Sequence, residues 1–206
     1  MRSALLAVAL VVCATVGIAA HAQSPSQSAL AEALRQGGYV LLMRHASSPL
    51  APPAAAAAEP DNAKPERQLD ERGKATARAM GGALRTLGVP VGRVLSSPTF
   101  RALQTARLAG LPTPTTAPEL GDGGQSMQAA GEARGAWLRA RVAEPPPPGA
   151  NIIIITHLPN IAAAYPQEST GLADGEAMIF HPGAGGGFTG RIKIEDWPAL
   201  ADRARE

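Results

Sequence analysis

The chain contains one cysteine and few aromatic residues. Of its 206 residues, 3% are Phe, Trp or Tyr, and the single cysteine is Cys13. One cysteine excludes a disulfide within the chain, and the scarcity of aromatic residues means that the core must be built mainly from aliphatic side chains. The hydrophobic content of 45% is nevertheless ordinary for a folded protein. Length and composition therefore predict one globular domain.

Clustered positive charge is also missing. The sequence has 19 Lys and Arg residues and 17 Asp and Glu residues. Its pI is near 9.0, but it contains no run of basic residues. Nucleic acids are bound by concentrated basic side chains. We therefore expect no nucleic-acid partner.

The first residues, 1–22, are typical of a secretory signal peptide. Arg2 precedes an apolar stretch that ends in Ala20-His21-Ala22, a small-x-small cleavage pattern. The stretch is marginal for spanning a bilayer, so we expect cleavage rather than a stable membrane anchor. The mature chain would be residues 23–206, one domain without cysteine, located in the periplasm or secreted.

Two apolar runs end in polar residues. Tyr39 to His45 closes with Arg44 and His45, and the four isoleucines Ile152 to Ile155 are followed by Thr156 and His157. Continuous apolar runs are typical of central parallel strands, which are covered on both faces. Ligands of open α/β sheets bind at the carboxyl ends of such strands. We therefore expect the two histidines to lie at one functional edge.

The rest of the pattern alternates helices with strands, which predicts an α/β fold: a three-layer α/β/α sandwich with a mostly parallel central sheet and a hairpin at one side. Between the first strand and Asp70, which can cap the next helix, residues 46–67 are rich in Pro and Ala and read as a long active-site loop. The other expected elements are helices at 28–35, 71–87, 98–109, 127–142 and 158–165 and from 196, and strands at 91–95, 111–116, 176–181 and 190–194.

A third functional group is expected at the start of the helix that follows residue 97. Ser97 is placed to cap this helix, Pro98 to occupy its first position, and Arg101 to lie one turn in. Arg44, His45, Arg101 and His157 would then meet near a helix N-terminus. Arginine forks and free backbone N–H groups bind phosphoryl oxygens, and a neutral imidazole can act as a nucleophile on phosphorus. We expect no metal site, since no third ligand has suitable spacing and the arginines would repel a cation.

Three sequence blocks, 42–46, 96–106 and 155–157, resemble the signature blocks of the histidine phosphatase superfamily, which has the phosphoglycerate mutase-like fold. The resemblance extends from about residue 30 to 200. It implies that His45 is the nucleophile that becomes phosphorylated, that Arg44 and Arg101 clamp the phosphoryl oxygens, and that His157 hydrogen-bonds the transferring group. Arg67 resembles an accessory phosphate contact of small relatives, or is a structural arginine. No cofactor is implied.

The chain departs from the family pattern at two points. Ala46 replaces the usual glycine after the nucleophile, and Leu158 stands where one branch has an acid. The proton donor for the leaving alkoxide is therefore open between Glu119 and Glu176, either of which can also be a surface carboxylate. His181 has no polar companions of this kind and is expected to be structural.

These features predict an exported phosphomonoesterase that works through a phosphohistidine, without a metal, on a small-molecule or headgroup phosphate ester. A protein substrate falls within the same class. Export and the short chain argue against a glycolytic mutase. The alternative is a phosphate-recognising binding protein of the same fold that has lost turnover.

Overall fold

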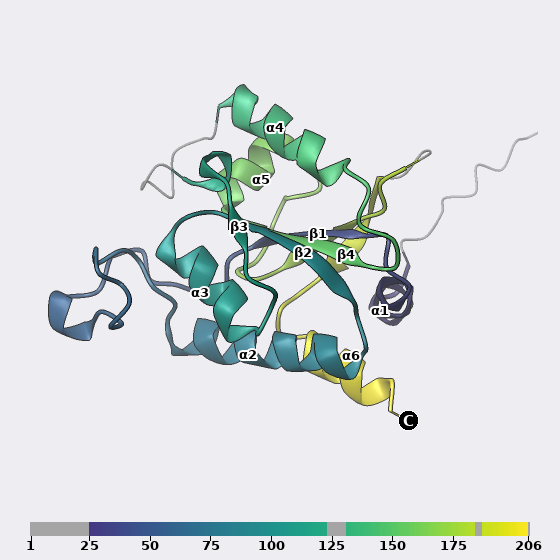
Figure 1. Ribbon diagram of the computed structural model, residues 1–206, viewed down its shortest axis with the longest axis horizontal. Helices are drawn as coiled ribbons and strands as arrows, with labels where there is room; N and C mark the ends of the chain where they lie inside the picture. The colour runs from purple at the N-terminus through teal and green to yellow at the C-terminus, as the bar shows by residue number, and fades with distance from the viewer. Residues whose placement is uncertain (1–24, 123–130, 184–186, 206) are drawn as a thin grey trace, which may run out of the picture.

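A six-stranded mixed sheet forms the middle of the molecule (Figure 1). The computed structural model describes residues 25–122, 131–183 and 187–205. The strand order is β3-β2-β4-β1-β5-β6. The first four strands in this order run parallel, and β5 and β6 form an antiparallel hairpin at one edge. This confirms the predicted α/β/α sandwich with a mostly parallel sheet. The strands are β1 (Val40–Arg44), β2 (Val91–Ser96), β3 (Thr115–Thr116), β4 (Asn151–Thr156), β5 (Ala177–Phe180) and β6 (Phe188–Ile192).

Helices cover both faces of the sheet. One face carries α1 (Gln27–Arg35), α2 (Glu71–Thr86), α3 (Phe100–Leu108) and α6 (Trp197–Arg203), and the other carries α4 (Glu132–Val142) and α5 (Leu158–Ala164). Two short 3-10 helices, η1 (Ala55–Ala57) and η2 (Pro118–Leu120), lie in the connections. Figure 1 shows α4 and α5 above the sheet and α2 and α6 below it.

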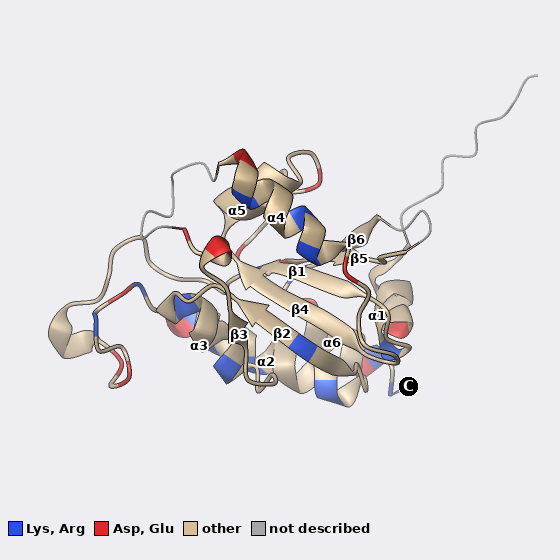
Figure 2. Cartoon of the chain, turned by 45° about the horizontal axis from the view of Figure 1, so that its top comes forward, with Lys and Arg blue, Asp and Glu red and all other residues tan. Residues whose placement is uncertain are grey.

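Strand β4 is central because it is apolar on both faces. Ile153 and Ile155 pack in the core beneath α2 and α3, while Ile152 and Ile154 pack in the second core beneath α4 and α5. All six of its residues are buried, and it carries no charge, whereas the Lys and Arg residues lie mostly on helices and loops (Figure 2). Burial on both faces is the pattern expected of a central parallel strand.

The start of α2 is fixed directly to the chain that leaves β1. Asp70 Oδ1 accepts a hydrogen bond from the Gly73 N–H at 2.7 Å, which confirms Asp70 as the N-cap. Its Oδ2 accepts from Ser47 Oγ at 2.7 Å. Gly73 is required here because a Cβ atom would lie 2.1 Å from the Ser47 carbonyl oxygen. The helix start therefore holds the backbone two residues after His45.

The helix containing Arg101 begins later than the sequence pattern predicts. Helix α3 starts at Phe100, and Thr99 is its N-cap without a side-chain hydrogen bond to the helix. The capping role expected of Ser97 is wrong. Its Oγ accepts from the Thr99 N–H at 3.2 Å, inside the turn, and also contacts His157. Arg101 consequently lies in the first turn of α3, at the edge where β2 and β4 end.

Two sequence predictions fall partly or wholly on residues outside the described ranges. The signal peptide of residues 1–22 lies outside them, as do residues 127–130 of the helix expected over 127–142. Among the described helices, none combines the length and the hydropathy needed to cross a membrane.

Candidate active site

The register of the sheet brings the two histidines together. Strands β1 and β4 are parallel neighbours in which Arg44 lies opposite Thr156, so His45 and His157 leave the sheet side by side. Their ring centroids are 5.1 Å apart with an interplanar angle of 63°. Both side chains are buried, with 3% and 1% of their surfaces exposed. The predicted convergence of the two strand ends is therefore present.

The hydrogen bonds of His45 fix its tautomer. Nδ1 lies 2.8 Å from the carbonyl oxygen of Ala46, which can only accept, so Nδ1 carries the proton. Nε2 is then unprotonated and accepts from Arg101 Nε at 3.2 Å. The lone pair of Nε2 points at the guanidinium that would hold a phosphoryl group. This is the arrangement that a nucleophilic histidine needs.

His157 has the opposite tautomer. Its Nδ1 is 3.1 Å from Arg101 Nη2, and since arginine is only a donor, Nδ1 must accept. The proton therefore resides on Nε2, which donates to Ser97 Oγ at 2.9 Å. Ser97 in turn donates to Thr99 Oγ1 at 3.1 Å. Ser97 thus orients the second histidine, a role that the sequence pattern did not indicate.

The backbone after His45 is held by α3. The Ala46 N–H donates to Thr105 Oγ1 at 3.1 Å, and Thr105 donates to the Arg101 carbonyl at 2.8 Å. Ala46 is fully buried. Its φ is negative, because no described residue other than glycine has a positive φ. Alanine is therefore compatible with the backbone at the position where the family usually has glycine.

Arg101 lies at the centre of the cluster. It is 3% exposed, and its guanidinium contacts both histidines and forms an ion pair with Asp122. The Asp122 carboxylate also lies 3.7 Å from His157 Nδ1. Asp122 was missed in the sequence because an Asp between two glycines reads as a turn residue. Asp122 is the carboxylate that contacts Arg101 and lies near His157.

Arg44 reaches the cluster from the end of β1. Its Nη2 forms an ion pair with Asp174 at 2.6 Å, and its Nη1 donates to the Leu172 carbonyl at 3.4 Å. The positive charge of Arg44 is close enough to lower the pKa of both His45 and His157. Asp174 therefore positions this arginine beside the two imidazoles.

Arg67 lies at the border of the site and also closes the loop of residues 46–67. Its guanidinium donates to the Pro49 carbonyl at 2.6 Å and to Ser48 Oγ at 2.9 Å. Its charge contributes to lowering the pKa of Arg101 and His157, so it is close to both. The structural role proposed for it from the sequence is present, and its position suits an accessory phosphate contact as well.

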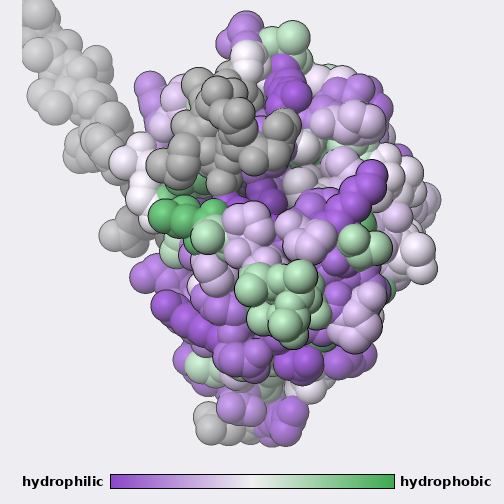
Figure 3. All heavy atoms as spheres, turned by 90° about the vertical axis from the view of Figure 1, so that its left-hand side faces the viewer, coloured by the Kyte–Doolittle hydropathy of each residue, from purple (hydrophilic) through white to green (hydrophobic). Residues whose placement is uncertain are grey.

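The loop of residues 46–67 projects beside the start of α3 (Figure 1). Glu66 Oε2 accepts from the Phe100 N–H at 3.0 Å, at the N-terminus of the helix that carries Arg101. On the visible side of the molecule where this loop projects, hydrophilic residues alternate with small apolar patches (Figure 3). The loop is therefore placed to contact whatever is attached to a bound phosphate.

Neither of the two acids considered from the sequence has its carboxylate in a hydrogen bond or ion pair with Arg44, His45, Arg101 or His157, although the backbone of Glu176 accepts from the Arg44 N–H at 3.3 Å. Glu119 is exposed on η2 and has no ion pair with any described residue. Glu176 is 3% exposed, but its carboxylate accepts from the Ala173 N–H at 2.9 Å and pairs with Arg191 at 3.2 Å. His181 lies at the far end of β5 against Tyr39, with ring centroids 4.9 Å apart. Its expected structural role fits this position.

Both active-site histidines are held in the neutral form. Burial lowers the pKa of His157 to about 3, helped by the charges of Arg101, Arg67 and Arg44. Burial, the neighbouring His157 and the two arginines of the signature blocks also hold the pKa of His45 well below its usual value. A neutral imidazole keeps the lone pair that nucleophilic attack requires. Within the described ranges, no group of three or more His, Cys, Asp or Glu side chains is arranged to hold a metal ion.

Solved structures share the fold of this chain. A protein histidine phosphatase SixA complexed with tungstate is 23% identical, with a TM-score of 0.55 over 77% of this chain and 98% of that one. A phosphoserine phosphatase mutant from Entamoeba histolytica, in complex with phosphoserine, is 13% identical, with a TM-score of 0.53 over 76% of this chain and 98% of that one. No curated protein matches the sequence. At this identity the structures show a shared fold.

A family model identifies the chain more closely. The model described as histidine phosphatase superfamily (branch 1) matches residues 40–152, which include His45, Arg101 and Asp122. The match covers more than half of the 206 residues. The chain therefore belongs to the histidine phosphatase superfamily, branch 1.

Proposed function

We propose that this protein is a metal-independent phosphomonoesterase that transfers a phosphoryl group to His45 and then to water. The observation that carries the proposal is the unprotonated Nε2 of His45, which lies 3.2 Å from Arg101 Nε in a buried cluster. A nucleophile and an oxyanion-binding guanidinium are thus in contact before substrate arrives. As phosphorus approaches Nε2, the phosphoryl oxygens replace Nε2 as the acceptor of the Arg101 N–H.

In the first step, Nε2 of His45 attacks phosphorus and the bond from phosphorus to the ester oxygen breaks. Arg101 and Arg44 neutralise the negative charge of the phosphoryl oxygens. His157 either turns its Nε2–H towards these oxygens or remains hydrogen-bonded to Ser97. The proton stays on Nδ1 of His45 throughout, hydrogen-bonded to the Ala46 carbonyl oxygen, and this hydrogen bond stabilises the positive charge on the phosphorylated ring. The product of this step is a phosphohistidine and an alkoxide that needs a proton.

Asp122 is the proton donor in this proposal. Its carboxylate is paired with Arg101 in the free protein, and a phosphate bound to Arg101 would displace it towards the ester oxygen. Beside a phosphate dianion the carboxyl group would bind a proton, which it gives to the leaving oxygen. In the second step the same carboxylate takes a proton from water as the water attacks phosphorus, and His45 is regenerated.

The burial of the site limits which substrates can reach it. The histidines and Arg101 are almost fully buried, so only a narrow group such as a phosphoryl at the end of a chain reaches them. The similar folds were solved with tungstate and with phosphoserine, which supports a tetrahedral oxyanion at this place. We propose a small-molecule or headgroup phosphate monoester as the substrate.

Purified protein should release inorganic phosphate from an aryl phosphate in the presence of EDTA, and His45→Ala should abolish this release. The matched control is His181→Ala, which removes a histidine at the opposite edge of the sheet and should leave the rate unchanged. Rapid quenching with radioactive substrate should trap an acid-labile label on wild type and not on His45→Ala. Equal inactivity of wild type and His45→Ala over a broad panel of phosphate esters would refute the enzymatic function.

One observation favours a second candidate, a phosphate-binding protein without turnover. Asp122 pairs with Arg101 in the free protein, and the position after His157 is Leu158 instead of an acid. If Asp122 serves only to neutralise Arg101, phosphate would bind and remain unreacted. Calorimetric binding of a phosphate ester without labelling of His45 would support this second candidate and exclude the first.

We also propose that the protein is exported, on the basis of the leader pattern in residues 1–22. Cell fractionation of the full-length protein in a Gram-negative host should place it outside the cytoplasm. Terminal sequencing should begin at Gln23. Recovery of a cytoplasmic chain that still contains residues 1–22 would refute export.

A further inference from the structure

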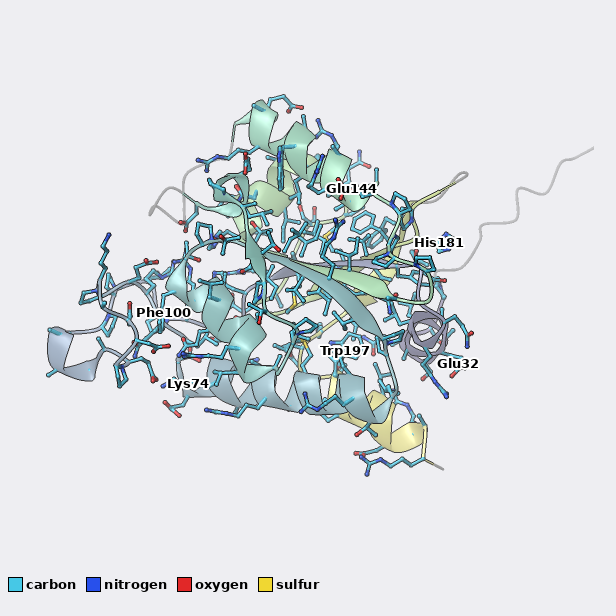
Figure 4. All side chains as sticks on the ribbon, viewed as in Figure 1. Glu32, Lys74, Phe100, Glu144, His181 and Trp197 are labelled. Carbon is cyan, nitrogen blue, oxygen red and sulfur yellow. The ribbon has the colours of Figure 1, made fainter. Side chains whose placement is uncertain are left out.

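A cavity lies at the edge of the sheet opposite to the candidate active site. It has a volume of about 510 Å³ and is bounded by β5, β6, the end of α4 and the segment after α5. Phe180 pairs with Val40 at the first residue of β1, whereas His45 follows the last residue of β1. Five strand residues span roughly 16 Å. Figure 4 shows the same separation: the labelled His181, which lines the cavity, and Phe100, at the start of α3, lie on opposite sides of the molecule.

The few aromatic residues of the chain are concentrated around this cavity. Tyr165, Phe180 and Phe188 line it, and Tyr39 packs on His181 at its margin. These are both tyrosines and two of the three phenylalanines of the whole sequence. Centroid distances of 4.6 Å between Tyr165 and Phe180 and 5.8 Å between Phe180 and Phe188 form a continuous aromatic wall.

Part of this wall is open to solvent. Phe188 is 40% exposed, although nearly all other large apolar side chains of the described residues are buried. Leaving aromatic surface in water costs free energy that packing elsewhere would recover. An exposed ring at the mouth of a cavity is therefore a feature typical of a ligand site.

The charge at the cavity is negative. Glu168 lines it, and its carboxylate has no ion pair with any described residue. The cations nearby are neutralised by other carboxylates: Arg139 by Glu132 at 2.6 Å and Arg191 by Glu176 at 3.2 Å. Arg191 also donates to the Glu168 carbonyl at 3.3 Å, which fixes the backbone that presents this carboxylate.

We propose that this cavity is a binding site for a small organic cation, an alkylammonium group that contacts the aromatic wall and lies beside Glu168. Cations bind over aromatic faces within about 6 Å of the ring centre, and a carboxylate adds direct charge complementarity. The site is separate from the phosphoryl-transfer cluster and does not depend on the function proposed for that cluster.

The test compares two probes of the same shape. Choline and its neutral carbon analogue 3,3-dimethylbutan-1-ol are titrated into the full chain by calorimetry at about pH 8, where imidazole groups are neutral. Choline should bind about tenfold more tightly than the analogue. Glu168→Gln should weaken choline binding about tenfold, whereas Asp202→Asn, an exposed carboxylate on α6, should leave it unchanged.

A second variant tests the aromatic wall. Phe188→Leu keeps apolar volume on β6 but removes the π face, and it should weaken choline binding about fivefold without lowering the melting temperature by more than a few degrees. Phosphate release by Glu168→Gln should equal that of wild type, so failure of this site and failure of the proposed enzymatic function can be told apart. Equal binding of the two probes, no binding of choline, or unchanged binding by Glu168→Gln would overturn the proposal.

Discussion

The chemistry of the active site depends on which nitrogen of each imidazole carries the proton. His45 donates a hydrogen bond from Nδ1 to a backbone carbonyl and accepts one from Arg101 at Nε2. His157 donates from Nε2 to Ser97 and accepts from Arg101 at Nδ1. Because the arginine can only donate, neither ring can protonate without losing a contact with it. Burial is the main cause of the lowered pKa of both histidines, and the Arg101 guanidinium lowers it further and orients both rings.

Asp122→Asn tests whether this carboxylate supplies the leaving-group proton. General acids contribute about 10²–10⁴-fold to a rate, and they matter most when the leaving group is a poor one. We therefore expect kcat on an alkyl phosphate to fall by about that factor, and kcat on p-nitrophenyl phosphate to fall much less. Steady-state kinetics on both substrates gives the comparison.

The matched control for this variant is Glu119→Gln, the acid suggested by sequence position, which should retain wild-type kcat on both substrates. Thermal melting should accompany the kinetics, since Asp122→Asn leaves the buried Arg101 without its counterion. Loss of activity in Glu119→Gln, or full activity of Asp122→Asn on the alkyl phosphate, would assign the proton donor elsewhere.

The sequence predicts some of these residues and not others, for physical reasons. His45 and His157 follow strand ends and Arg101 lies near a helix start, so the local pattern marks them as candidates for one functional edge, and the resemblance to the family implies that they meet. Asp122 reaches Arg101 only because the chain after β3 folds back over the edge of the sheet. No local periodicity encodes that contact across 21 positions.

At the scale of the elements, the crossing of α2 with the end of α3 depends on one glycine. A Cβ atom on Gly81 would lie 1.8 Å from the Ala109 carbonyl oxygen, whereas a Cβ atom on the neighbouring Gly82 would meet nothing within 4 Å. The two glycines occupy the same helix, so they differ only in what they face. Replacing each glycine by alanine therefore distinguishes the effect of helix propensity on stability from the effect of packing.

Gly81→Ala should lower the free energy of unfolding by about 1–3 kcal/mol, because the two helices must move apart. Gly82→Ala should raise it by about 0.5–1 kcal/mol, because alanine loses less entropy in a helix. Urea denaturation of both variants provides the measurement. Equal and stabilising effects of the two substitutions would show that the close approach of α2 to Ala109 does not constrain the fold.

The two helix starts near the site illustrate what capping patterns can predict. Asp70 caps α2 as expected because its carboxylate has two oxygens: Oδ1 accepts from the Gly73 N–H while Oδ2 accepts from Ser47 Oγ. Ser97 does not cap α3, because its single hydroxyl oxygen is bound by His157, distant in sequence, and by the Thr99 N–H. A capping pattern therefore fails where a distant functional group occupies the one oxygen that would cap the helix.

For the molecule as a whole, the alternation of helices and strands predicts the layered sandwich, and the apolar run of β4 predicts a central strand. The order of the strands is not encoded locally. Strand β4 lies between β1 and β2 although it follows both in the chain, and this depends on how the covered faces of the three strands fit together. Sequence pattern predicts which strands are buried on both faces, but not their neighbours.

The buried neutral histidines couple the stability of the whole fold to pH. In the native state the pKa of His157 is about 3, while an unfolded histidine has its usual pKa of about 6.5. Above that value both states are neutral and pH has no effect through this group. As pH falls below it, the imidazole of His157 is protonated in the unfolded state and stays neutral in the native state, so stability is lost until the native pKa is reached.

His157→Asn removes one such group. The free energy of unfolding of wild type should therefore fall more steeply than that of the variant, by about 1.4 kcal/mol per pH unit between about pH 6 and 4. Urea denaturation over this range measures both slopes, and parallel slopes would mean that His157 is protonated in the folded protein.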